Sequence, residues 1–116
     1  MAARFIYETQ CLKIRIKSGS TQKVLEWFKT VNRRLDEAYE AIGKEGIVIQ
    51  SIFLDKGSDG DFLIFYMKAD NLLKANQLIR KSTRAIDKEA LKMIENHSDE
   101  EKTLENLLDL DRIEEV

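Results

Sequence analysis

The sequence predicts an α+β domain in which helices cover one face of an antiparallel sheet. Three observations support this fold class. Residues 10–17, QCLKIRIK, alternate between apolar and polar side chains, as a half-buried strand does. Over residues 21–43, apolar side chains recur at spacings of three and four, which indicates an amphipathic helix. Two apolar segments, 46–56 and 61–70, flank the turn sequence GSDG and predict a hairpin.

Length and composition limit the class of protein. At 116 residues the chain has the size of a single domain, with residues 1–9 as an N-terminal extension. The 19 basic and 21 acidic residues give a net charge of -2, which argues against a general nucleic-acid binder. The single cysteine, Cys11, excludes an internal disulfide and a cysteine-rich zinc site. No segment has the apolar length of a signal peptide or a membrane span, so we expect a cytoplasmic protein.

The first strand and the first helix follow from periodicity. One face of the strand carries Leu12, Ile14 and Ile16, and the other carries Cys11, Lys13, Arg15 and Lys17. The turn SGST follows, in which Ser20 or Thr21 can cap a helix. We expect that helix to run uninterrupted to a C-cap at Gly43, over about six turns.

The second half of the chain predicts two further helical segments. Asp70 or Asn71 caps the first of them, which turns Leu72, Ala75 and Ile79 inward. The helical pattern breaks within STRAID, residues 82–87, and resumes with Ile86, Ala90, Met93 and His97 on one stripe. HSDEE, residues 97–101, is a polar interruption with capping-box spacing from Ser98 to Glu101.

The order strand, helix, strand, strand, helix and strand is that of the split βαβ, or ferredoxin-like, fold. Residues 104–113 supply the fourth strand in this interpretation, since Leu108 and Leu110 alternate with Asp109 and Asp111. The alternative is a three-stranded sheet with an extra C-terminal helix, because Leu104, Leu107 and Leu108 also fit a helix.

The third strand has two apolar faces. Leu63, Phe65 and Met67 match the helix-facing set of the first strand, so Phe62, Ile64, Tyr66 and Lys68 point to the open face. The second strand adds Ile47, Ile49 and Phe53, or Val48, Ile52 and Leu54, to that face. Such a patch exceeds what a monomer usually exposes. A second copy of the chain, a ligand or single-stranded RNA could cover it, and we expect a homodimer. The alternative is a C-terminal tail that folds back over the sheet of a monomer.

The open face also carries the candidate binding residues Lys13, Arg15, Tyr66 and Lys68. A guanidinium and a phenol can orient a small anionic or aromatic ligand, so these four residues predict a ligand pocket. The alternative is that they pair with the dimer partner, for example with Asp109 or Asp111.

The sequence gives little support for RNA binding, metal binding or a resident cofactor. RNA-recognition domains share this element order, but GDFLIFY lacks their basic-Gly-aromatic opening and the first strand offers no aromatic side chain. RNA binding is therefore the weakest of the three hypotheses for the open face. His97 is the only histidine, so a histidine-based metal site is not expected. We expect no resident cofactor.

Three segments resemble a family of small bacterial proteins, a domain of unknown function with a ferredoxin-like, dimeric α/β-barrel type of fold. They are LKIRIKSGSTQKVLEWF, EGIVIQSIFLDKGSDGDFLIFYMKADNLLKA and KSTRAID, and the resemblance spans about residues 12–113. It implies the four-stranded fold and assigns no activity. The wider dimeric α/β-barrel group includes cofactor-independent monooxygenases and isomerases, so such an enzyme is the alternative function. Fold alone does not decide between them.

Overall fold

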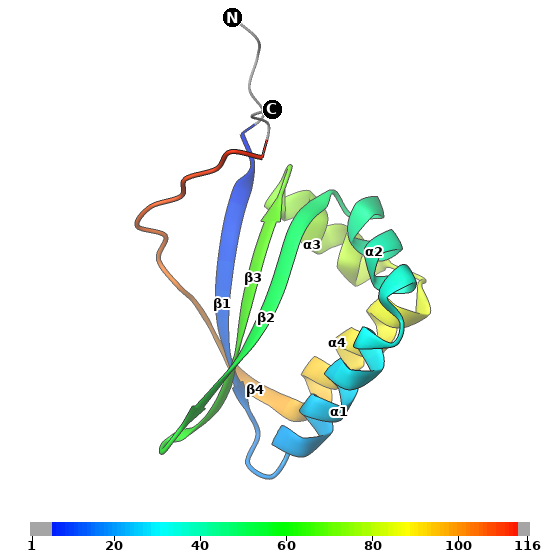
Figure 1. Ribbon diagram of the computed structural model, residues 1–116. Helices are drawn as coiled ribbons and strands as arrows, with labels where there is room; N and C mark the ends of the chain where they lie inside the picture. Colours follow the sequence, from blue (N-terminus) through cyan, green and yellow to red (C-terminus); the bar gives the residue numbers. More distant parts are fainter. Residues whose placement is uncertain (1–5, 114–116) are drawn as a thin grey trace, which may run out of the picture.

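The computed structural model describes residues 6–113, in which four antiparallel strands form one layer and four helices cover one of its faces (Figure 1). The elements in chain order are β1 (Glu8–Ile16), α1 (Thr21–Asn32), α2 (Leu35–Lys44), β2 (Ile47–Gly57), β3 (Gly60–Ala69), α3 (Leu72–Lys81), α4 (Ala85–His97) and β4 (Ser98–Thr103). The strand order is β2-β3-β1-β4, with every neighbouring pair antiparallel. The predicted ferredoxin-like α+β fold is confirmed.

The helix-facing side of the sheet forms the core, as predicted. Ile14 and Ile16 of β1 and Leu63 of β3 pack with Val24 of α1 and Met93 of α4. A second cluster lies at the other end of the sheet under α3 and contains Ile47, Met67, Ala69 and Ala75. Apolar side chains at alternate strand positions thus meet the helices over the whole length of β3.

The orientation of β2 was left open by its sequence and is decided by its pairing with β3. Phe53 lies opposite Ile64 and Ile49 opposite Lys68, so both belong to the open face. Ile52 lies opposite Phe65 and packs under the helices. A register shift between Ile47 and Ile49 then returns Ile47 to the helix side. This irregularity is a β-bulge, which alternation alone cannot reveal.

The prediction of one helix over residues 21–43 is wrong, because the chain breaks at residues 33 and 34. The side chain of Asn32 donates to the carbonyl oxygen of Phe28, and Arg34 leaves helical geometry with φ -126° and ψ 39°. A straight helix of that length would extend about 35 Å. The break instead lets α1 and α2 follow the twisted sheet.

Gly43 is not the C-cap that the sequence suggested. Helix α2 continues through Lys44, Glu45 is the capping residue, and Gly46 adopts the positive φ of 74° that glycine tolerates best. The amide of Glu45 donates to the carbonyl oxygen of Ala41 at 3.1 Å. This cap fixes the backbone of Glu45 at the point where α2 meets β2.

The fourth strand exists, but its predicted position at residues 104–113 is wrong. Strand β4 is Ser98–Thr103, the segment expected to be a polar interruption, and residues 104–112 have no regular structure. It pairs only with β1, and residues 99–103 are exposed. Charged side chains suit such an edge strand because they discourage pairing with other chains. They also remove the apolar alternation by which a strand is recognised.

The remaining helices agree with the sequence pattern. Asn71 caps α3, and its side chain accepts a hydrogen bond from the Lys74 amide at 2.9 Å. Ala75 is fully buried, and the chain breaks before α4 begins at Ala85. At the N-terminus, β1 begins at Glu8, inside the predicted extension, and residues 1–5 of that extension lie outside the described residues.

Candidate functional site

A cavity of about 260 Å³ lies between the sheet and the helices. It is smaller than most pockets for drug-sized ligands, and mostly apolar side chains from both layers line it. Its larger apolar lining residues are Leu12, Ile14, Trp27, Phe28, Val31, Ile42, Ile52, Phe65, Met67, Ile79, Ile86, Leu91, Met93 and Ile94. Trp27 is the only tryptophan of the chain, which makes the cavity accessible to fluorescence.

Glu45 and Asp87 also line this cavity, as does the exposed Glu101. Glu45 and Asp87 are only 3% and 9% exposed. Nη1 of Arg84 lies 3.6 Å from Oε2 of Glu45 and 3.6 Å from Oδ2 of Asp87, beyond hydrogen-bonding range. Within the described residues, neither of these two carboxyl oxygens has a hydrogen-bond partner. Buried polar atoms are usually paired, so the two oxygens are unusual.

Burial raises the pKa of Glu45 to about 8, and its hydrogen bond with Asp87 and the negative charge of that residue act in the same direction. The positive charge of Arg84 opposes the shift without cancelling it. The raised pKa favours the protonated, neutral form of the Glu45 carboxyl group at neutral pH. A neutral acid beside a carboxylate is an arrangement that other proteins use for proton transfer.

The ends of two helices bring these carboxyl groups together. Glu45 caps the C-terminal end of α2, Arg84 caps the N-terminal end of α4, and Asp87 lies in the first turn of α4. Arg34, at the N-cap of α2, binds Glu89 of α4 at 2.9 Å. Two contacts, one near each end of α2, thus tie it to α4.

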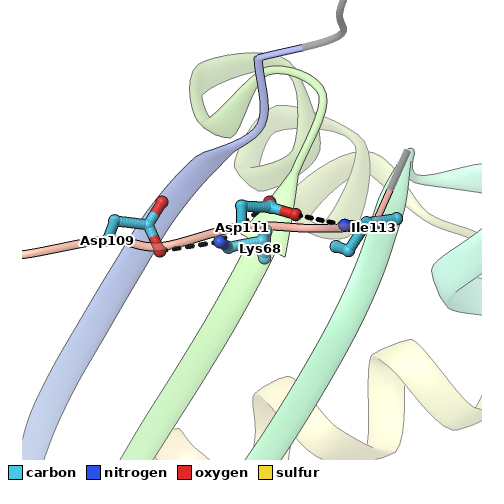
Figure 2. Close-up of polar contacts among 4 residues, drawn as sticks. All are labelled: Lys68, Asp109, Asp111 and Ile113. Carbon is cyan, nitrogen blue, oxygen red and sulfur yellow. Dashed lines mark hydrogen bonds and ion pairs between the residues drawn. The ribbon is translucent and has the colours of Figure 1, made fainter. Parts of the chain in front are cut away.

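The open face holds a different polar cluster, formed by Lys68 and the C-terminal tail. We use the term tail for residues 104–113. Figure 2 shows the tail crossing β1, β3 and β2 on the face opposite the helices. Nζ of Lys68 donates to Asp109 at 2.7 Å and to Asp111 at 2.9 Å, and Lys68 is only 2% exposed (Figure 2). Burial disfavours the charged amine, but the bonds to both aspartates outweigh it and raise the pKa of Lys68.

The four residues predicted to bind a ligand fall into two groups on this face. Lys68 is enclosed by the tail, and Tyr66 borders a more open hollow between the tail and β1. Lys13 and Arg15 lie toward the hairpin, where Nζ of Lys13 is 4.4 Å from the ring centre of Phe62. Neither the cavity beneath the helices nor the hollow beside the tail is lined by all four of them.

Other polar groups have local partners. Lys13 forms an ion pair with Asp55 at 3.7 Å, and Arg15 donates to the carbonyl oxygen of Asp59 at 3.4 Å. His97 is half buried at the end of α4, and its Nδ1 lies 3.2 Å from the Ser20 hydroxyl. Within residues 6–113, no group of three or more His, Cys, Asp or Glu side chains is arranged to hold a metal ion.

Glu45, Arg84 and Asp87 were not identified from the sequence. Glu45 belongs to GKEG, which has the composition of an exposed turn, and Asp87 lies in the first turn of a helix, where an aspartate is common. Their burial depends on the meeting of α2 and α4, which are separated by two strands and a helix. One feature of the sequence could have indicated their burial: Glu45 lies close to the apolar residue Ile47, and Asp87 lies next to Ile86.

Comparison with known proteins identifies a family whose function is unknown. The model of a family described as a family of unknown function (DUF6176) matches residues 7–115. A search of curated proteins finds no match. A crystal structure from Bacillus cereus, described as an antibiotic biosynthesis monooxygenase, is similar with a TM-score of 0.42 and 14% sequence identity. The similarity covers 87% of this chain and 90% of that one. Among residues 6–113, no helix has the length and apolar character to cross a membrane.

The raised pKa of Glu45 predicts a pH-dependent stability. A carboxyl group whose folded-state pKa lies above its ordinary 4.5 stabilises the protein below that value. The contribution is lost as the pH rises to about 8. Glu45→Gln imitates the protonated acid, so its unfolding free energy should exceed that of the wild type by about 1–2 kcal/mol at about pH 9 and by less at about pH 5. Urea unfolding measures both values.

Glu37→Gln is the matched control for this measurement. Glu37 is exposed, and its hydrogen bond to Arg34 lowers its pKa, so its substitution should leave the stability change between those two pH values as in the wild type. An equal pH dependence in the wild type and in Glu45→Gln would contradict the assignment of the proton to Glu45.

The contact between Lys68 and the tail predicts that the double variant Asp109→Asn, Asp111→Asn releases the tail. Loss of both carboxylates leaves a buried cation without a counter-charge, which should lower the unfolding free energy by about 1–3 kcal/mol. Limited proteolysis with thermolysin should then cut at Leu107 or Leu108 faster than in the wild type, as mass spectrometry can show. Glu105→Gln, an exposed tail position, should change neither quantity. Equal cleavage of the double variant and the wild type would show that the tail does not depend on Lys68.

Proposed function

This chain belongs to that family of unknown function, and we propose that it binds a small, mainly apolar molecule with one polar group between the sheet and the helices. The observation that carries the proposal is the pair of buried carboxyl oxygens, on Glu45 and Asp87, that line an apolar cavity without hydrogen bonds. An unpaired buried polar group costs about 1–3 kcal/mol. A ligand that supplies the missing hydrogen bonds would recover that cost.

The chemistry of the cavity defines the class of ligand. Its apolar walls favour a hydrocarbon or aromatic body, and its volume of about 260 Å³ equals that of roughly nine liquid water molecules. A protonated Glu45 can donate one hydrogen bond, and a carboxylate at Asp87 can accept others. The ligand should therefore present an acceptor and a donor, or a polarised C–H group, at one end. Fixed polar groups at one end of an apolar pocket are typical of small-molecule sites.

We also propose that the protein functions as a homodimer joined through the open face. Phe53 is 60% exposed on this face. Leu107, Leu108 and Leu110 of the tail are 86%, 74% and 82% exposed. Apolar side chains on both the sheet and the tail create a surface that two copies could bury against each other about a two-fold axis.

A second candidate site remains the one predicted from the sequence on the open face. The position of Lys13 over the ring of Phe62, with Arg15 beside it, favours an anionic or aromatic ligand at the hairpin end. Tyr66 and Lys68 could contribute to that site only after the tail moves, because Asp109 and Asp111 hold Lys68.

The binding proposal predicts that small apolar carbonyl compounds change the fluorescence of Trp27. We would titrate the protein with phenylacetone, benzamide and cyclohexanone. Ala90→Phe places a ring in the cavity and should weaken binding of every active probe by at least about tenfold. Ala85→Phe, an exposed position on the same helix, is the control and should bind as the wild type does. Absence of any fluorescence change, or equal affinity in Ala90→Phe, would overturn the proposal.

The dimer proposal predicts a mass of twice 13.5 kDa in light scattering at micromolar concentration. Phe53→Asp should shift the protein to the monomer mass, because a charge would be buried at the interface. Leu73→Asp is the control, since Leu73 is 71% exposed on the helical side of the molecule, and this variant should remain dimeric. A monomeric wild type would refute the proposal.

A further inference from the structure

We propose that Glu45 and Asp87 act as an acid and a base on the bound molecule, and that the substrate is a small apolar carbonyl compound with a C–H group next to the carbonyl. The reaction is the interconversion of the keto and enol forms. This inference rests on the proposed binding of a small molecule in the same cavity. It adds a reaction and a substrate class to that binding.

The geometry of the two carboxyl groups supports these roles. Both carboxyl groups line one cavity, both residues are at least nine-tenths buried, and each has an oxygen without a hydrogen bond within the described residues. Arg84 forms an ion pair with each of these oxygens at 3.6 Å and donates a hydrogen bond to neither of them. Each residue therefore retains an oxygen that can interact with a ligand.

The electrostatics of the two helix ends distinguish the acid from the base. Glu45 lies at the C-terminal end of α2, where the helix dipole disfavours a negative charge. Asp87 lies in the first turn of α4, where the dipole favours one. The two helix ends thus place the proton on Glu45 and the negative charge on Asp87. This assignment agrees with the burial of Glu45, which is the less exposed of the two.

The charge balance at the two carboxyl groups favours a neutral substrate. One proton shared by two carboxyl groups leaves a charge of -1, which Arg84 balances. An ionic ligand would leave an uncompensated charge in an apolar cavity, at a cost of several kcal/mol. A neutral carbonyl compound avoids this cost. Its oxygen accepts from the Glu45 carboxyl group, and its apolar body contacts residues such as Trp27 and Phe65.

The chemical step balances without another reactant. The Asp87 carboxylate removes a proton from the carbon next to the carbonyl, and the electrons of the broken C–H bond form a carbon–carbon double bond. The carbonyl electrons move to oxygen, which takes the proton from Glu45. The substrate leaves as its enol, Asp87 is now protonated, and Glu45 is ionised. Reversal, or proton exchange between the two carboxyl groups, restores the starting state.

Deuterium exchange tests the inference directly. The full-length protein is mixed with phenylacetone in D₂O, and proton NMR follows the loss of the methylene signal. The wild type should accelerate the exchange by at least about 100-fold over buffer, which is the usual scale of acid–base catalysis. Asp87→Asn and Glu45→Gln should each remove most of this acceleration while phenylacetone still changes the fluorescence of Trp27. Glu95→Gln, an exposed position on α4 away from the junction with α2, should exchange as the wild type does.

The outcomes separate the inference from the proposed function. If phenylacetone binds but exchanges no faster than in buffer, the acid–base role is refuted and the binding proposal stands. Acceleration that survives both substitutions also refutes it. If phenylacetone, benzamide and cyclohexanone all fail to bind, the proposed function fails and the inference fails with it. If Asp87→Asn does not fold, Glu45→Gln alone tests the inference. Glutamine is uncharged like the protonated acid it replaces, so this variant should fold.

Discussion

The structure depends on a single constraint, the two apolar faces of the central strand β3. Leu63 and Met67 require cover on one side, and Phe62, Ile64 and Tyr66 on the other. Four helices supply the first cover, and the tail crosses part of the second (Figures 1 and 2). A single layer of helices cannot bury both faces of one sheet. The unequal cover explains why the helix side contains a closed core, whereas large apolar side chains such as Phe53 remain exposed on the open side.

The helices follow the twist of the sheet, and α2 therefore turns away from α1. The break at residues 33 and 34 places the C-terminal end of α2 against the N-terminal end of α4. Two helix ends of opposite polarity then meet at the cavity, and each contributes a carboxyl group. Arg84 and Arg34 hold this junction through ion pairs with residues of the opposite helix. The candidate site is therefore a product of helix geometry, and it joins residues that lie about forty positions apart in the chain.

Local patterns predicted the strands β1, β2 and β3, the hairpin and the two faces of β3, because each depends on side chains within a few positions. The same patterns failed where the decisive contact is distant. Strand β4 is polar and owes its conformation to pairing with β1, so its sequence resembles a turn. The bulge before Ile49 follows from pairing with β3. Glu45 and Asp87 were missed for a related reason, since the burial of a charged residue depends on its neighbours in space, and their closeness to the apolar positions Ile47 and Ile86 is too weak a signal to predict it.

The two faces of the sheet differ in the kind of group that is left without a partner. On the open face, three cations have acceptors within the chain: Lys68 binds the two tail aspartates, Lys13 pairs with Asp55, and Arg15 contacts the Asp59 carbonyl oxygen. Apart from the Thr9 hydroxyl oxygen, which has no hydrogen bond, what this face leaves uncovered is apolar surface, whose burial favours association. On the helix side the apolar surface is largely buried, and what remains unsatisfied is a pair of carboxyl oxygens inside a cavity. Apolar surface drives assembly, whereas unpaired buried acids bind and move protons. For this reason we propose association for the open face and chemistry for the cavity beneath the helices.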